Sequence, residues 1–187
     1  MRLLQALFCT LLIGLVFGSA TVMADDTPQE KRQSILKMKN EVLEELYNVK
    51  PKAKSEIASA PGYAVFSNAN INIIFASFSG GRGVVIDKGG KQTFMKMGEL
   101  GIGLGLGIKD FRAVFIFHQR STMEEFIKNG WEFGGHADAA AKASDNGAAV
   151  GGEALIDGIT IYQLTQSGLA LQATVKGTKY WKDDDLN

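Results

Sequence analysis

The chain is poor in the residues that carry metal, disulfide or redox chemistry. Its 187 residues include one cysteine and two histidines. The histidines, His118 and His136, show neither of the H-x-x-x-H and H-E-x-x-H spacings that place two ligands on one metal ion. The cysteine, Cys9, lies in an apolar stretch near the N-terminus, so no disulfide framework holds the fold. We expect a fold held by apolar burial, with no metal and no cofactor.

Net charge is absent as well. The 20 basic residues equal the 20 acidic residues in number. A nucleic-acid-binding domain normally carries a broad excess of positive charge, so this balance argues against a nucleic-acid partner. Attraction to an anionic lipid surface would have to come from a local basic patch.

Catalytic motifs are missing or broken. There is no G-x-S-x-G nucleophile elbow, and no carboxylates are paired for acid–base work. Three fragments imitate a serine acyl-enzyme: Ser34 with Lys37, then Ser144–Asn146, then Lys176–Thr178. The third reads K-G-T where the motif needs K-T-G, and Ser34 lies within an amphipathic helical pattern. We therefore expect no enzymatic activity.

A long transmembrane run is also missing. After Arg2, the apolar stretch Leu3–Phe17 is shorter than the roughly 20 residues that cross a bilayer, and small residues follow it up to Ala24. This is the pattern of a secretory signal peptide. We expect residues 1–24 to be removed after Ala24, and the protein to be exported to the periplasm or the cell envelope. An uncleaved anchor is the alternative.

The remainder has the length of one domain, with a helical segment over residues 25–62 and a β-rich core over 63–187. Thr27-Pro28-Gln29-Glu30 forms a capping box with proline at the first helical position, which predicts a helix start. Apolar residues then recur at helical spacing up to about Asn48, and a shorter helix is expected over 51–60. The apolar positions are Ile35, Met38, Val42, Leu46 and Val49.

The rest of the chain alternates β-branched and aromatic runs with turn residues. Asp87–Lys91 predicts a hairpin turn, Ser121-Thr122-Met123-Glu124 predicts a second capped helix ending near Gly130, and Asp183–Asp185 predicts a solvated tail. Together these patterns predict an α+β fold, with N-terminal helices packed on a largely antiparallel, glycine-rich sheet or partial barrel. The strands are expected over 63–66, 71–78, 84–86, 92–97, 101–108, 111–117, 159–164 and 169–175.

The expected strand over 101–108 has an unusual pattern, because glycine alternates with a large aliphatic residue. The glycines therefore share one face and leave it nearly bare. Either tight sheet packing or the approach of an acyl chain, a membrane or a partner explains such a face. It is not a dinucleotide fingerprint, since no helix opens after it. The glycines of this stripe are Gly101, Gly103, Gly105 and Gly107.

Three stretches together resemble the SYLF family: Gly80–Val85, Met97–Phe117 and Tyr162–Gly177. The likeness spans Val42 to Tyr180. It implies a lipid-binding module, since eukaryotic relatives bind phosphoinositides through an N-terminal amphipathic segment and can bind actin, whereas bacterial members are commonly exported. The chain departs from the family pattern at Ser67, where proline is frequent, and over Gln92–Met95. For an exported chain of bacterial type, actin is not an expected partner.

The resemblance directs attention to basic residues of the N-terminal helices and to Arg82. A membrane-surface helix needs basic residues beside an apolar face. The glycines around Arg82 could present backbone N–H groups and a guanidinium to a phosphate. The alternatives are a helix that packs only on its own sheet, and a glycine turn with Arg82 in solvent. The candidate lipid-binding residues are Lys31, Arg32, Lys50, Lys52, Lys54 and Arg82.

We therefore predict a non-enzymatic module of the bacterial cell envelope. It would bind anionic phospholipid, or a membrane surface, through this basic patch and the glycine-rich sheet face. The alternative is a protein-interaction or structural envelope module, whose glycine face packs against a partner or a second copy of the chain. The sequence leaves the lipid, the oligomeric state and the biological process open.

Overall fold

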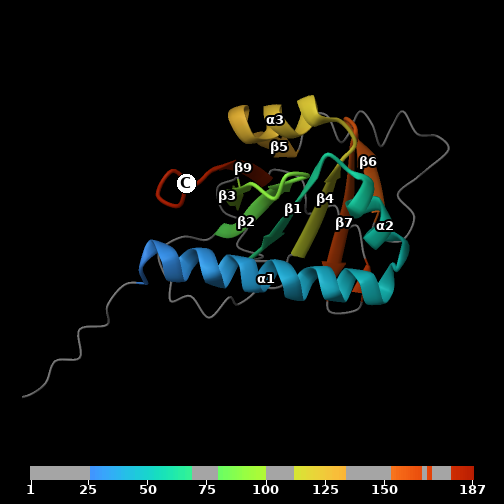
Figure 1. Ribbon diagram of the computed structural model, residues 1–187, viewed down its shortest axis with the longest axis horizontal. Helices are drawn as coiled ribbons and strands as arrows, with labels where there is room; N and C mark the ends of the chain where they lie inside the picture. The colour runs from blue at the N-terminus through green and yellow to red at the C-terminus, as the bar shows by residue number, and fades with distance from the viewer. Residues whose placement is uncertain (1–25, 69–79, 100–111, 134–152, 166–167, 170–177) are drawn as a thin grey trace, which may run out of the picture.

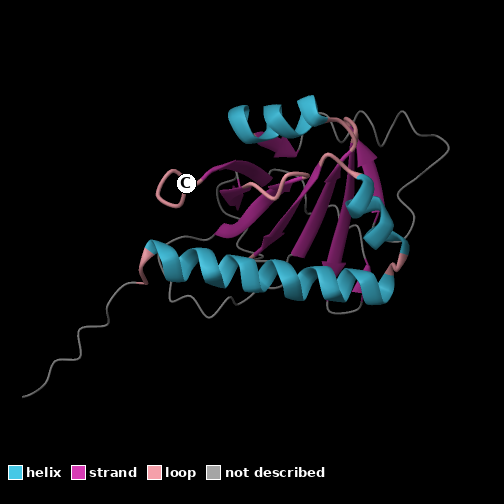
Figure 2. Ribbon diagram, viewed as in Figure 1, coloured by secondary structure: helices cyan, strands magenta, loops and turns pink. Residues whose placement is uncertain are grey.

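The computed structural model describes residues 26–68, 80–99, 112–133, 153–165, 168–169 and 178–187. Within these residues, one antiparallel sheet lies between helices on both faces (Figures 1 and 2). The helices are α1 (Pro28–Val49), α2 (Lys52–Ser59) and α3 (Arg120–Asn129). The strands are β1 (Gly62–Ser67), β2 (Gly80–Asp87), β3 (Gln92–Glu99), β4 (Arg112–Phe117), β5 (Trp131–Phe133), β6 (Glu153–Ile156), β7 (Ile159–Thr165), β8 (Gly168–Leu169) and β9 (Thr178–Lys182).

The strand order across the sheet is β5-β9-β3-β2-β1-β4-β7-β6, and β8 pairs with β7. All of the recorded pairings are antiparallel. Helices α1 and α2 lie on one face, and α3 covers the other (Figure 1). The predicted α+β class, with helices packed on an antiparallel sheet, is confirmed.

Helix α1 begins where the capping box predicts. Thr27 Oγ1 accepts a hydrogen bond from Glu30 N at 3.3 Å, and the Glu30 carboxylate accepts one from Thr27 N at 2.8 Å. Two backbone donors at the start of the helix are thereby satisfied. The apolar face packs on β1, β2 and β4 and is completely or almost completely buried. It comprises Ile35, Met38, Val42, Leu43 and Leu46, whereas Val49, predicted to share this face, is 45% exposed.

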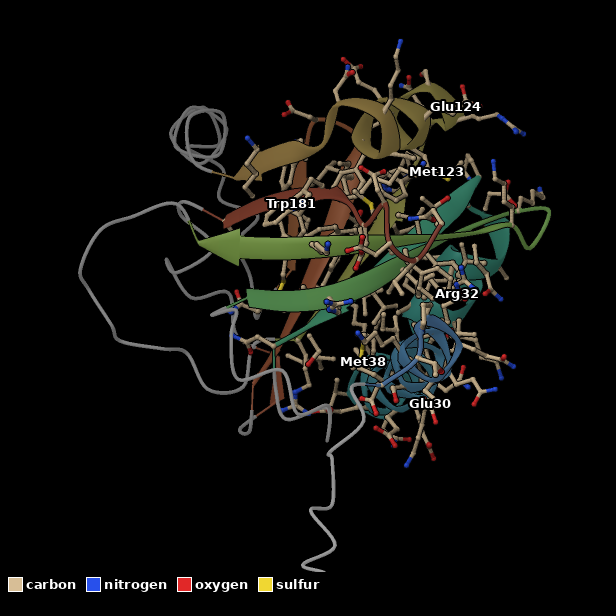
Figure 3. All side chains as sticks on the ribbon, turned by 90° about the vertical axis from the view of Figure 1, so that its left-hand side faces the viewer. Glu30, Arg32, Met38, Met123, Glu124 and Trp181 are labelled. Atoms are coloured by element: carbon tan, nitrogen blue, oxygen red, sulfur yellow. The ribbon has the colours of Figure 1, made fainter. Side chains whose placement is uncertain are left out.

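The second predicted capping box, at Ser121, does not form. Helix α3 begins at Arg120 and its N-cap residue is Gln119, which makes no capping hydrogen bond through its side chain. Strand β4 runs to Phe117, and His118 N still donates to Gly158 O beside the sheet, so the chain turns directly into the helix. Met123 points from α3 toward the sheet, and Glu124 points away from it (Figure 3). The predicted end at Gly130, with a φ of 70°, is confirmed.

The β2–β3 hairpin fixes the register of the neighbouring strands. Its turn forms as predicted: Gly90 takes a φ of 84°, and Lys91 N donates to Asp87 Oδ1 at 2.9 Å. Antiparallel partners then follow in order away from the turn, so Arg82 lies directly opposite Lys96. Side chains opposite each other share one face of the sheet. Two basic side chains are therefore neighbours on the α1 face.

The sheet is curled into a partial barrel, as expected. Strands β9 and β4 are four positions apart in the strand order, which would separate them by about 19 Å in a flat sheet. The ring centroids of Phe115 on β4 and Tyr180 on β9 are nevertheless only 5.2 Å apart. Phe126 of α3 contacts both rings. The concave face thus closes around an aromatic core beneath α3.

The glycines before Val84 belong to strand β2. Residues 82–83 pair with β1 on one side and β3 on the other, and Gly81 pairs with Met97 of β3, so these residues belong to the ladder and do not form an anion-binding nest. A Cβ atom at Gly83 would lie 2.3 Å from the Phe66 ring and from the Val65 carbonyl oxygen. Gly83 is therefore required for the close approach of Phe66 to the sheet.

Several predictions fall on residues outside those described: the signal peptide over 1–24, the strand over 71–78, the glycine stripe from Gly101 to Gly107, and residues 170–175 of the closing hairpin. They stay predictions. Of the helices that the structure describes, none has both the length and the apolar character needed to span a bilayer.

Candidate functional site

The predicted basic residues separate into two groups at opposite ends of α1. Lys31 and Arg32 lie in its first turns, and Lys50, Lys52 and Lys54 surround the junction with α2. At 1.5 Å per residue, about 28 Å of helix separates Lys31 from Lys50. The structure therefore gives two candidate sites in place of one basic patch.

The first site is the α1–α2 corner, defined here as residues 49–54. Val49 is 45% exposed, one of two large apolar residues so exposed in the described part of the chain. Lys52 and Lys54 are exposed next to it, and Lys50 lies with its Nζ 5.9 Å from the centroid of the Tyr162 ring. The corner thus combines an apolar side chain with flanking lysines at the surface.

The corner is held on the sheet by a buried tyrosine. Tyr162 of β7 has no exposed surface, and its hydroxyl donates to Glu56 Oε2 at 2.6 Å. Glu56 in turn forms a salt bridge with Lys52 Nζ at 3.3 Å. Because Glu56 lies on α2 and Tyr162 on the sheet, this bond fixes the direction in which α2 leaves α1.

The second site is the cation cluster, defined here as Lys31, Arg32, Arg82 and Lys96. Arg82 Nη1 donates to Asp183 Oδ2 at 2.9 Å, and Lys96 Nζ lies 3.0 Å from Asp183 Oδ1. Lys96 also donates to Asp185 at 3.0 Å. The Asp183 side chain has no exposed surface, so its charge is neutralised inside the protein by two strands.

Residues 183–187, named here the acidic segment, bind to the cation cluster and to the edge of α1. Leu186 is 1% exposed and packs in the core beneath α1, and its carbonyl oxygen accepts from Arg32 Nε at 2.8 Å. Asn187 pairs with both backbone groups of Phe94. Figure 3 shows Arg32 on the side of α1 toward the sheet, with Glu30 on the opposite side. The predicted solvated tail is therefore wrong for Asp183, because the segment continues the β9 pairing past Lys182.

The contacts in the cation cluster shift the pKa values of Lys96 and Asp185. Burial lowers the pKa of Lys96, but hydrogen bonds and charge from Asp183 and Asp185 outweigh it, and the net shift is upward. The hydrogen bond and the charge of Lys96 lower the pKa of Asp185, with smaller contributions from Arg82 and Lys31. Both shifts favour the charged forms, so the ion pairs persist over the neutral pH range.

Sequence reasoning missed Lys96, although a signal was present. The predicted turn at Asp87–Lys91 implies a register in which Arg82 and Lys96 lie equally far from the turn. Counting outward from the turn would have paired the two cations. Arg112 of β4, a further basic residue on this face, pairs with Glu45 of α1. His118, for its part, shares a 2.7 Å hydrogen bond with the Thr160 hydroxyl, and the described residues contain no cluster suited to a metal ion.

Comparison with known proteins identifies the family. Residues 98–187 match the Ysc84 family, which is described as "Las17-binding protein actin regulator" and is characterised by the SYLF domain. Residues 98–187 belong to the SYLF family. The SYLF segment includes β4 and α3, the strands that follow them, and the whole acidic segment. The resemblance predicted from the sequence is confirmed.

A curated relative extends the likeness toward the N-terminus. The protein named beta cell expansion factor A, from Aeromonas veronii, is 34% identical over 167 residues, which make up 86% of this chain and 60% of that protein. The present chain thus spans about three fifths of the relative's length. SYLF membership supports a lipid-binding or interaction module, and members of this family are generally binding modules and not enzymes.

Proposed function

We propose that this protein is a non-enzymatic lipid-binding module of the cell envelope that contacts anionic phospholipid through the α1–α2 corner. The observation that carries the proposal is the exposed Val49, which lies among Lys50, Lys52 and Lys54. An interfacial contact needs an apolar side chain to enter the acyl boundary and cations to attract the headgroups. The corner supplies both within six residues.

The rest of α1 does not offer an apolar face to a membrane. Its apolar side chains are buried against the sheet, as the alternative interpretation of the amphipathic pattern expected. The proposed contact is therefore a shallow one at the helix junction, not a helix lying flat with its apolar face in the bilayer. Such a contact is weak and depends on salt, since about 1 kcal/mol comes from each lysine near an anionic surface.

The test is flotation of residues 25–187 with phosphatidylglycerol vesicles and with phosphatidylcholine vesicles, at low and moderate salt. We expect salt-sensitive flotation with the anionic vesicles alone. The Lys52→Gln/Lys54→Gln variant should then bind roughly thirtyfold more weakly, which is the loss expected for two lysines. Val49→Ser should weaken binding at both salt concentrations, because its contribution is apolar.

The matched control is Lys128→Gln/Lys179→Gln, which removes the same charge from exposed lysines of α3 and β9. Equal weakening of vesicle binding in the two double variants would show that net charge alone matters. It would overturn the assignment of the membrane contact to the α1–α2 corner. Absence of flotation with any vesicle would favour the second candidate, a protein-interaction module. That candidate has its own support, because the matched family is described by the binding of a protein, Las17.

The envelope location is part of the proposal. It rests on the signal-peptide pattern that ends at Ala24. Fractionation of the producing cell, followed by N-terminal sequencing, should recover a periplasmic or envelope-bound form that begins at Asp25. A cytoplasmic form that keeps residues 1–24 would contradict it.

A further inference from the structure

The cation cluster is covered by the chain's own carboxylates. Its four basic residues come from α1, β2 and β3, and the acidic segment brings Asp183 and Asp185 to them. Asp183 is the most deeply placed, with no exposed surface between Arg82 and Lys96. Asp185 is different, because its side chain is 80% exposed while it still contacts Lys96. One buried and one exposed carboxylate thus neutralise part of the cluster's positive charge.

The acidic segment also ties the first turns of α1 to the sheet. Arg32 donates to the Leu186 carbonyl, while the Leu186 side chain lies in the core beneath α1. On its other side the segment hydrogen-bonds to β3, since Asp183 N and Asn187 both pair with Phe94. Opening the segment would therefore uncover the cations and loosen the beginning of α1 in the same step.

Both candidate sites lie along one side of α1. An α-helix has 3.6 residues per turn, so residues that are 18 apart differ by five whole turns and point in the same direction. Lys31 and Val49 are related in this way. A flat anionic surface that contacts Val49 at the α1–α2 corner therefore extends along α1 toward Lys31.

We propose that the acidic segment is an autoinhibitory, intramolecular ligand of the cation cluster, and that an anionic membrane surface opens it by competing for the same cations. The carboxylates of Asp183 and Asp185 occupy the positions that lipid phosphates would take. This inference rests on the proposed function for the source of the competing anions. The closure of the cluster by the segment does not depend on that function and is tested separately.

The test compares Asp185→Asn with Asp184→Asn. Both variants remove one negative charge from adjacent exposed aspartates, but Asp184 lies only near Lys182, at 4.0 Å, whereas Asp185 contacts the cluster. In the absence of lipid, Asp185→Asn should speed amide hydrogen exchange in residues 28–36 and 183–187, with α3 unchanged. Asp184→Asn should leave all three regions as in the unmodified protein. Equal exchange in the two variants would overturn the closure.

The competition is tested with phosphatidylglycerol vesicles. Asp185→Asn should reach half-binding at about one fifth of the lipid concentration needed by Asp184→Asn, the effect of one opposing charge near the surface. The vesicles should also speed exchange of residues 183–187 in the unmodified protein. If exchange responds to Asp185→Asn but no form binds vesicles, the proposed lipid function fails and the closure stands. If all forms bind equally and the segment stays protected, competition by lipid is overturned.

Discussion

The carboxylate of Asp183 accepts a hydrogen bond from Arg82 at 2.9 Å, although 101 residues separate the two in the sequence. The same carboxylate lies 3.0 Å from Lys96, so a single buried aspartate neutralises cations on two adjacent strands. Because a buried charge without a partner is costly, the arrangement makes each of the three residues dependent on the others.

Asp183→Asn is expected to destabilise the protein by about 3 kcal/mol, because Arg82 and Lys96 lose their common counter-charge in a mostly buried place. Urea denaturation gives the free energy of unfolding. The control is Asp184→Asn, whose exposed side chain should change stability by less than about 0.5 kcal/mol. If Asp183→Asn lowers the free energy of unfolding by less than about 1 kcal/mol, Arg82 and Lys96 must be hydrated by water in place of the lost carboxylate.

The stabilisation from Asp185 should not vary with pH between about 5 and 9. The pKa of Asp185 is lowered from its ordinary value of 3.8, so its contribution is present above that value and is lost as pH falls through the folded-state pKa. The pKa of Lys96 is raised from 10.5, so its contribution is present below that value and is lost at higher pH. Unfolding of Asp185→Asn beside the unmodified protein, across this range, checks the result. A difference in the free energy of unfolding between Asp185→Asn and the unmodified protein that changes near pH 7 would contradict these directions of the two pKa shifts.

Removing the hydroxyl group from each of two buried tyrosines should change the free energy of unfolding in opposite directions. Tyr180 has no exposed surface, and its hydroxyl has no hydrogen-bond partner among the described residues; burial strongly raises its pKa. Tyr180→Phe keeps the ring contact with Phe66 and should stabilise the protein by about 1 kcal/mol.

The contrasting variant is Tyr162→Phe, which removes the bond to Glu56 and should cost about 1–2 kcal/mol. Thermal unfolding of both variants measures the difference in sign. Destabilisation by Tyr180→Phe would reveal a partner for that hydroxyl.

Gly83→Ala should cost about 3 kcal/mol, since the new methyl group would meet the Phe66 ring and the Val65 carbonyl at 2.3 Å. Gly89→Ala in the β2–β3 turn is the control, because the new methyl group would lie 3.2 Å from the Asp87 side chain, which needs to shift by only a few tenths of an ångström. Equal stability of the two variants would show that β1 and β2 can separate without cost.

Local patterns predicted the elements but not always their exact beginnings. The capping boxes at Thr27 and at Ser121 have the same kind of sequence, yet only the first forms. At the start of α1, the side chains of Thr27 and Glu30 make the capping hydrogen bonds themselves, so the local sequence decides where the helix begins. The start of α3 is set by β4, whose hydrogen bonds extend to His118 and leave one residue before the helix.

The site was harder to predict because its parts are distant in the sequence. Lys96 could have been found from the hairpin register, which is a local property. The burial of Asp183 could not, since it depends on β9 joining β3, and three consecutive aspartates give no indication of which one is enclosed. The separation of Lys31 from Lys50 could also have been found, because the predicted helix from Thr27 to about Asn48 already places them at its opposite ends.

The position of β9 also determines when the protein can fold. Tyr180 completes the aromatic core beneath α3, and Leu186 completes the core beneath α1. Neither core can therefore be complete without residues 178–187. Contacts between such distant segments form slowly, because a long loop must close before they stabilise anything. We therefore expect that a growing chain cannot complete either core until these residues have been synthesised. An incompletely folded polypeptide can be threaded through a translocation channel, as the proposed export would require.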